Sequence, residues 1–376
     1  IGEGSAMKRK GGLRFAVPGL ALCVLAGTAR ADEEKVLNLY NWSNYFAPDT
    51  LAGFEKETGI KVRYDAYDSD ETLQSKLLTG NSGYDLVWPT NDFMAKQIQA
   101  GVFRKLDRNR LPNLKYLDPS LLKQMAQSDP GNQYGVPYMW GTVGVGYDRA
   151  RVRAILGKDM PADSLDLLFK PEIAARVSAK CGLGLQDSAS TVLPLALRYI
   201  GHDPMHPSAQ DYAAAQAMLM KIRPFIREFV NSSDANELID GELCVTVGFS
   251  GAISLAAQKA KARDPKRDVV YDIPRIGTLM WFDAMVIPAS AKHPDNAHAF
   301  INYILRPDVI AKISNSTRYA NANQGALKLM DPALVRNPGI YPDEATRRTL
   351  FTPIAESPAA MRLEGRTWLG FKTARP

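Results

Sequence analysis

The sequence is poor in the residues that catalysis and metal binding use most. Its 376 residues include 3 cysteines and 4 histidines. His202 and His206 are four residues apart, but Pro204 and Pro207 break any helix that would align them as metal ligands. Residues 248–251 (Gly-Phe-Ser-Gly) lack the spacing of the hydrolase nucleophile turn. We therefore expect no catalytic centre, no metal site and no cofactor.

Apolar runs long enough to span a membrane are also missing. The run from 15 to 27 is too short for a membrane span and follows the basic start Met-Lys-Arg-Lys at Met7. The small-x-small triplet at 29–31 then matches a cleavage site, so we expect a signal peptide cleaved near Ala31. Residues 1–6 are expected to be a remnant of cloning. This pattern predicts an exported, periplasmic protein with no membrane span.

Little net charge remains once this leader is set aside. The whole chain carries 46 Lys and Arg against 40 Asp and Glu, and its pI is near 9.0. Residues 1–31 hold five of the cations and one of the acids, which leaves 41 against 39. A basic field that would attract nucleic acid is therefore not expected.

Two cysteines lie beyond the leader, Cys181 and Cys244. Export exposes them to an oxidising compartment, which favours one disulfide over the alternative of two buried free thiols. A bond closing a loop of this length should stabilise the fold by about 4 kcal/mol in the chain-entropy model.

Short apolar strands alternate with amphipathic helices along the rest of the chain. The alternation is typical of an α/β fold with a largely parallel sheet. We expect strands at 36–40, 61–65, 85–88, 136–147, 243–247, 269–273 and 281–287, and helices at 49–58, 71–78, 92–100, 211–222, 294–305 and 307–314.

The long extended stretch at 136–147 interrupts the alternation of short strands and helices and separates two α/β units. We expect a first lobe formed by 32–140 and 274–318, and a second lobe formed by 141–273 and 319–376. Ligands of such folds bind at the carboxyl ends of strands and in clefts between domains.

Aromatic side chains follow the ends of several expected strands and one helix. They are Trp42, Tyr45, Trp88, Phe249, Trp281 and Tyr319. Asp283 lies two residues after Trp281, so both side chains face the same side of a strand. Each aromatic alone is consistent with packing. Together with an acid, exposed aromatic side chains favour a site for a small organic cation.

Five segments carry a family resemblance: Asn-Trp-Ser-Asn-Tyr at 41–45, Phe-Glu-Lys-Glu-Thr-Gly-Ile-Lys-Val at 54–62, Pro-Tyr-Met-Trp-Gly at 137–141, Leu-Arg-Pro-Asp-Val at 305–309 and Tyr-Ala-Asn-Ala-Asn at 319–323. They closely resemble the periplasmic putrescine- and spermidine-binding proteins of ABC importers. The resemblance runs from about Lys35 to the C-terminus. It implies a type II periplasmic binding fold, two lobes that close on a ligand, no catalysis, and an inner-membrane ABC permease as partner.

The resemblance also assigns ligand-binding roles at matched positions. They are Trp42, Ser43, Asn44, Tyr45, Thr90, Asp92, Thr191, Phe249, Trp281, Asp283 and Tyr319. The two cysteines fall where members of the putrescine-binding branch have a disulfide.

Three acids of the family are replaced by neutral residues at Asn44, Ala252 and Ser190 or Thr191. One interpretation is a diverged polyamine-binding protein that repositions Asp92 and Asp187. The other is a changed ligand.

A changed ligand would carry an amine at one end and a carboxylate at the other, such as γ-aminobutyrate or 5-aminovalerate. Asp283 would bind the amine, while hydroxyl groups, with Arg318 as an added charge, would face the carboxylate.

We therefore expect a monomeric solute-binding protein that delivers a small amine to a permease. The alternatives are a ligand-loaded sensory or interaction protein and, with least support, an exported enzyme. An enzyme would need a nucleophile–base pair or a metal cluster, and the sequence offers neither.

Overall fold

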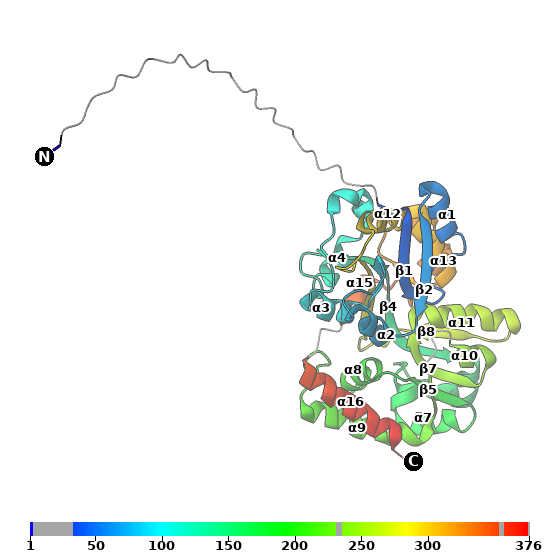
Figure 1. Ribbon diagram of the computed structural model, residues 1–376. Helices are drawn as coiled ribbons and strands as arrows, with labels where there is room; N and C mark the ends of the chain where they lie inside the picture. The colour runs from blue at the N-terminus through cyan, green and yellow to red at the C-terminus, as the bar shows by residue number, and fades with distance from the viewer. Residues whose placement is uncertain (3–32, 231–234, 353–356, 375–376) are drawn as a thin grey trace. The chain divides into compact units, whose positions relative to one another are not determined.

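The computed structural model describes residues 1–2, 33–230, 235–352 and 357–374. Apart from Ile1 and Gly2, the expected leader at 1–31 lies outside these residues. The chain divides into two units, Ile1–Glu33 and Glu34–Pro376. All helices and strands below belong to the second unit (Figure 1). No helix in the described ranges combines the length and apolarity needed to cross a membrane.

Ten strands form one sheet in the order β2-β1-β3-β9-β4-β7-β5-β6, and β8 and β10 pair with β4. The strands are β1 Val36–Trp42, β2 Lys61–Tyr67, β3 Leu86–Val87, β4 Gly135–Asp148, β5 Gly182–Gln186, β6 Ile226–Val230, β7 Leu243–Phe249, β8 Val269–Asp272, β9 Met280–Val286 and β10 Ala320–Asn321. All seven strands expected from the sequence are present with shifted ends.

The expectation of a largely parallel sheet was wrong. Parallel pairing is confined to β1 with β2 and β3, and to β5 with β6 and β7. Every pairing of β4 and β9 is antiparallel. The alternation of strands and helices predicts crossovers within each group. It does not reveal the direction of the strands that connect the groups, because direction depends on long-range pairing.

The helices cover the sheet and end where the sequence supplies local stop signals. They are α1 Thr50–Thr58, α2 Asp70–Leu77, α3 Asn91–Gln99, α4 Pro119–Met125, α5 Arg149–Leu156, α6 Asp166–Phe169, α7 Pro171–Ser178, α8 Ala189–Tyr199, α9 Ala209–Ile222, α10 Asn236–Asp240, α11 Ser250–Arg263, α12 Pro294–Ile304, α13 Pro307–Thr317, α14 Pro332–Val335, α15 Glu344–Arg347 and α16 Pro358–Thr373. For example, α1 ends at Gly59, whose left-handed backbone lets its N–H donate to the Glu55 carbonyl.

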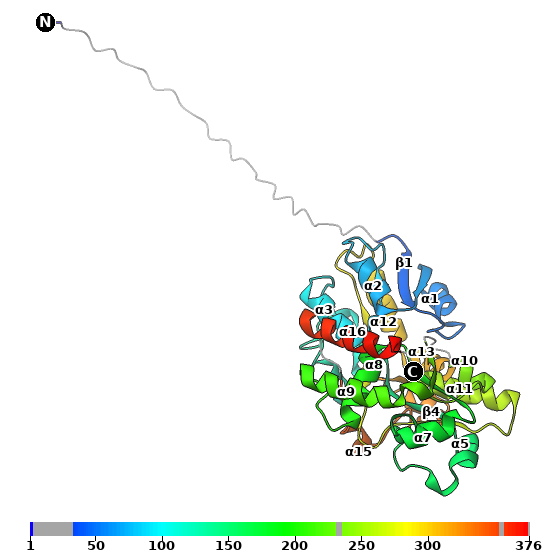
Figure 2. The same cartoon turned by 90° about the horizontal axis from the view of Figure 1, so that it is seen from below.

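Two large hydrophobic cores lie along β4. Met139 and Trp140 belong to the first core, and Val143 and Val145 to the second. Buried residues between 320 and 340 also pack in the first core, while α16 packs in the second, beside α8 and α9 (Figures 1 and 2). The division into lobes stays a prediction. This packing favours moving residues 320–340 from the second lobe to the first.

The expected disulfide joins Cys181, just before β5, to Cys244 in β7. The two Cα atoms are 5.9 Å apart, and both side chains are buried. The bond links two neighbouring strands of the second core across 63 residues of sequence.

Reducing the Cys181–Cys244 bond should lower the free energy of unfolding by about 4 kcal/mol, because the unfolded chain regains loop entropy. Denaturant unfolding with and without reductant measures the difference. As a control, reductant should leave the stability of the double variant Cys181→Ala/Cys244→Ala unchanged. Two free thiols in unreduced, periplasmically expressed protein would contradict the assignment.

Candidate functional site

Asp283 lies in the middle of β9 with only 4% of its surface exposed. The Tyr45 hydroxyl donates a hydrogen bond of 2.5 Å to its Oδ2 atom. The Tyr138 hydroxyl holds Tyr45 in turn by donating to its backbone carbonyl at 2.5 Å. The second oxygen of Asp283, Oδ1, is buried without a hydrogen-bond partner. Such an atom is costly in a fold and marks a place where a ligand can donate.

The surroundings of Asp283 favour its protonated form when no cation is present. The pKa of Asp283 is raised to about 7, chiefly by burial and to a smaller extent by repulsion from Asp92, while the hydrogen bond from Tyr45 lowers it. A ligand ammonium beside Oδ1 would compensate the charge and favour the ionised carboxylate.

Thr90 connects two more acids to this region. It precedes α3 and forms an isolated β-bridge with Asp283. Its Oγ1 atom lies 2.7 Å from Asp70 Oδ2 and 2.8 Å from Asp92 Oδ1. A hydroxyl has one proton to donate, so one of the two carboxyl groups must donate to it. Burial, followed by repulsion from Asp92, raises the pKa of Asp70 well above its usual range, which identifies Asp70 as the protonated partner.

Asp70 is a site residue that the sequence analysis missed. It opens α2, where an acid is ordinarily explained by the helix dipole alone. Its burial beneath Thr90 depends on the packing of α2 against α3, which no local pattern reveals.

Four aromatic side chains form a continuous series of edge-to-face contacts, here called the aromatic row. Tyr45 and Tyr319 have ring centroids 5.8 Å apart, Tyr319 and Trp281 5.3 Å, and Trp281 and Phe249 5.8 Å. The row begins at the Tyr45 ring, whose hydroxyl binds Asp283, and ends at Phe249 beside the second core. Rings arranged in this way offer π faces and apolar surface to an alkyl-ammonium ligand.

Two glycines, Gly141 on β4 and Gly251 in the first turn of α11, allow the aromatic row to pack closely against these elements. A Cβ atom on Gly251 would lie 2.3 Å from the Tyr319 ring, and one on Gly141 would lie 2.7 Å from the Trp281 ring. Tyr319 also follows Arg318, whose left-handed backbone (φ 65°) ends α13 and turns the chain toward β10.

The last residue of β1, Trp42, is half-buried, and the turn after it is exposed. Trp42 donates from Nε1 to the Trp88 carbonyl at 3.0 Å. Ser43 and Asn44 are exposed in the turn, and Asn44 adopts a left-handed backbone.

Trp88 and Tyr45 were expected to be exposed at strand ends, and this expectation was wrong. Trp88 is fully buried in the first core, and Tyr45 is 6% exposed. The local sequence around Trp88, a tryptophan followed by a proline at the end of a strand, does not reveal whether another element buries it.

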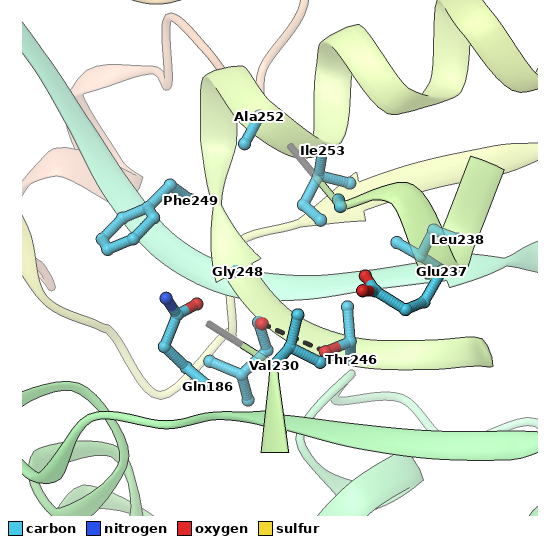
Figure 3. Close-up of a pocket in the computed structure, with 11 residues that line it drawn as sticks. Gln186, Val230, Glu237, Leu238, Thr246, Gly248, Phe249, Ala252 and Ile253 are labelled. Atoms are coloured by element: carbon cyan, nitrogen blue, oxygen red, sulfur yellow. Dashed lines mark hydrogen bonds between the residues drawn. The ribbon is translucent and has the colours of Figure 1, made fainter. Parts of the chain in front are cut away.

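The far end of the aromatic row borders a small cavity in the second core region (Figure 3). Phe249 and Ala252 line it from the β7–α11 connection, and Gln186 lines it from the end of β5. Thr191 is buried in the first turn of α8 and does not line this cavity.

Two charged residues considered for the ligand are occupied elsewhere. Asp187 accepts from Lys372 Nζ at 2.5 Å and from Trp368 Nε1 at 3.3 Å, both on α16. Arg318 pairs through Nη1 with Asp331 at 2.9 Å. Both charges are thus paired with residues outside the aromatic row.

The histidines do not form a metal site. His206 lies 3.2 Å from Asp203, and His202 contacts Asp211. Across the described part of the chain there is no group of three or more His, Cys, Asp or Glu side chains suited to hold a metal ion.

Comparisons with known proteins agree with the fold. The putrescine-binding periplasmic protein PotF of Escherichia coli K12 is 44% identical over 360 residues, covering 96% of this chain and 97% of the relative. SpuD, the putrescine-binding periplasmic protein of Pseudomonas aeruginosa, is 43% identical over 366 residues, covering 96% and 99%. The names of both relatives describe periplasmic proteins that bind putrescine.

Among solved structures, the spermidine/putrescine ABC transporter substrate-binding protein PotD of Streptococcus pneumoniae superposes with a TM-score of 0.77 at 28% identity, covering 90% of this chain and 99% of that one. The expected two-lobed periplasmic binding fold is thereby confirmed. The sequence profile of the bacterial extracellular solute-binding proteins matches residues 50–342. The chain therefore belongs to the family of bacterial extracellular solute-binding proteins.

Proposed function

We propose that this chain captures an amine of the putrescine and spermidine class in the periplasm and delivers it, as a monomer, to an inner-membrane ABC permease. The observation that carries the proposal is the buried, unpartnered Oδ1 atom of Asp283 beside the aromatic row. The names of the relatives, which refer to putrescine and spermidine, support the choice of an amine. The expected signal peptide, cleaved near Ala31, supports the periplasmic location.

The binding step follows from the chemistry of the site. A primary ammonium group donates to Oδ1 of Asp283 in a charge-assisted hydrogen bond, while Tyr45 holds Oδ2. Its methylene chain lies against Trp281 and Tyr319, where aromatic faces attract the cation and exclude water. Asp92 adds negative potential on the same side, while Asp70 is protonated and contributes no charge.

An ω-amino acid is the second candidate, because Ala252 and Thr191 are neutral at positions where a second acid was expected. This candidate needs a cationic or donor group for the carboxylate. Since Arg318 is paired with Asp331, it does not supply that charge. The structure therefore favours an amine without a carboxylate.

Calorimetry on ligand-stripped protein should show tighter binding of putrescine or spermidine than of γ-aminobutyrate or 5-aminovalerate. The physical reason is the unfavourable transfer of a carboxylate into a site that holds Asp283 and Asp92. Tighter binding of either amino acid than of both polyamines would reverse the assignment of the ligand class.

Asp283→Asn should weaken amine binding by about 2–5 kcal/mol, because the ammonium group is left desolvated beside a neutral amide. Calorimetric titration with spermidine measures the loss. Asp159→Asn is a matched control, since the Asp159 carboxylate is half exposed and pairs with Arg176 at the surface. Equal affinity of the Asp283 variant and the control would remove Asp283 from the site.

Affinity for the amine should rise with pH up to about 7 and then level off. The raised pKa of Asp283, about 7, means that the free protein must release a proton before it pairs with an ammonium. Below pH 7 the affinity should fall by up to about tenfold per pH unit.

The stability of the ligand-free protein should change with pH in the direction opposite to the amine affinity. Because the pKa of Asp283 is higher in the folded state than in the unfolded chain, the ligand-free protein should lose stability as pH rises from about 4 to about 7. For the binding step, calorimetric titration of the protein with the amine in two buffers of different ionisation enthalpy measures the proton that Asp283 releases. A proton uptake, or no pH dependence in this window, would contradict the protonated state of free Asp283.

A further inference from the structure

Two buried carboxylate oxygens lack a hydrogen-bond partner in the described ranges of the chain. One is Oδ1 of Asp283, and the other is Oε2 of Glu237. A buried carboxylate oxygen without a donor is unfavourable, even though the Glu237 residue as a whole is only half-buried, so each one calls for an explanation. The proposed amine accounts for Asp283. Glu237 lies on a different element and is not explained by that contact.

Glu237 sits on α10 and lines the same small cavity as Phe249 and Ala252. In Figure 3 its carboxylate points into the space between these residues, and the amide of Gln186 lies across from it. The remaining lining is mostly apolar. The cavity has room for roughly one water molecule, and a primary ammonium group is close to water in size. Its shape and its single acid therefore suit the charged end of an alkyl amine.

The Glu237 cavity and Asp283 lie at opposite ends of the aromatic row. Tyr45, whose hydroxyl binds Asp283, is the first ring, and Phe249, which lines the cavity, is the last. The sheet register sets the separation between Asp283 and Phe249, which lines the cavity. On β4, Asp283 is opposite Met139, and Phe249 is opposite Val143. Four residues of strand correspond to about 13 Å along β4.

We propose that Glu237 binds the second terminal ammonium of the ligand and thereby selects a polyamine of spermidine length over a four-carbon diamine. This inference rests on the proposed function and specifies its ligand. The terminal nitrogens lie about 6 Å apart in extended putrescine and about 11 Å apart in extended spermidine, from standard bond lengths. Only the longer chain approaches the separation along β4 between Asp283 and Phe249, the ring that lines the Glu237 cavity.

The inference also explains how a second charge can be bound although Ala252 is neutral. The small Ala252 side chain leaves space in the cavity, and Glu237 brings a carboxylate into it from α10. An acid is therefore present at this end of the row, supplied by a different element.

The test compares ligands that differ in length and charge. Ligand-stripped protein is titrated by calorimetry with spermidine, with α,ω-diamines of four to eight carbons, and with butylamine as a probe of one charge. The variants are Glu237→Gln, which removes the charge at constant size, and Glu242→Gln, a matched control at an exposed acid outside the cavity. Thermal unfolding without ligand verifies that each variant is folded.

Wild-type protein and Glu242→Gln should bind spermidine and the longer diamines at least tenfold more tightly than putrescine. Glu237→Gln should lose at least tenfold in spermidine affinity and bind butylamine as wild type does. Ala252→Leu fills the cavity without changing its charge. This variant should also bind spermidine more weakly, while its affinity for butylamine should stay unchanged.

Two results overturn the inference in distinguishable ways. If wild-type protein binds spermidine and both Glu237→Gln and Ala252→Leu bind it within twofold of wild type, the role of Glu237 is refuted and the proposed function stands. If wild-type protein binds none of the amines, the proposed function fails, and the role of Glu237 fails with it.

Discussion

The geometry of the site depends on one fourteen-residue strand, β4, which is buried along its whole length and contributes to both large cores. It pairs with β9 on one edge and with β7 on the other. Asp283 and Trp281 are therefore fixed relative to Phe249 by a hydrogen-bonded register rather than by loops. Since a shift of one residue would turn each side chain to the opposite face, the buried pattern of β4 fixes the site as firmly as it fixes the core.

This rigid frame holds charges that do not favour folding. Asp70 and Asp283 are buried, and burial raises the pKa of each. Such groups cost stability unless a partner compensates them. The fold tolerates them because β4, β9 and the surrounding aromatic side chains bury a large apolar surface. A cation that pairs with the buried acid of this site removes part of the free-energy cost of its burial. Ligand binding should therefore stabilise the folded protein.

The sequence predicted the elements better than the environment of single side chains. Hydrophobic alternation and glycine stop signals located strands such as β1 and helices such as α1, because these signals act within a few residues. The antiparallel course of β9, the burial of Trp88 and the role of Asp70 depend on contacts between distant segments. The Asp283–Trp281 pair was predictable, since a spacing of two residues on a strand places both on one face. Its partner Tyr45 was expected both as an aromatic side chain after the first strand and from the resemblance to the family.

Glu237 shows why matching positions one by one has a physical limit. A ligand responds to where a charge lies in space, and a carboxylate reaching in from α10 can occupy the region that a side chain at Ala252 would otherwise fill. The position-by-position comparison marks Ala252 as neutral and predicts a neutral pocket. The cavity that Ala252 leaves is nevertheless lined by an acid whose buried oxygen has no partner. Charge at a binding site is thus better counted from the side chains that line each end of it than from aligned residues, because electrostatic attraction depends on distance and dielectric surroundings and not on the order of residues in the chain.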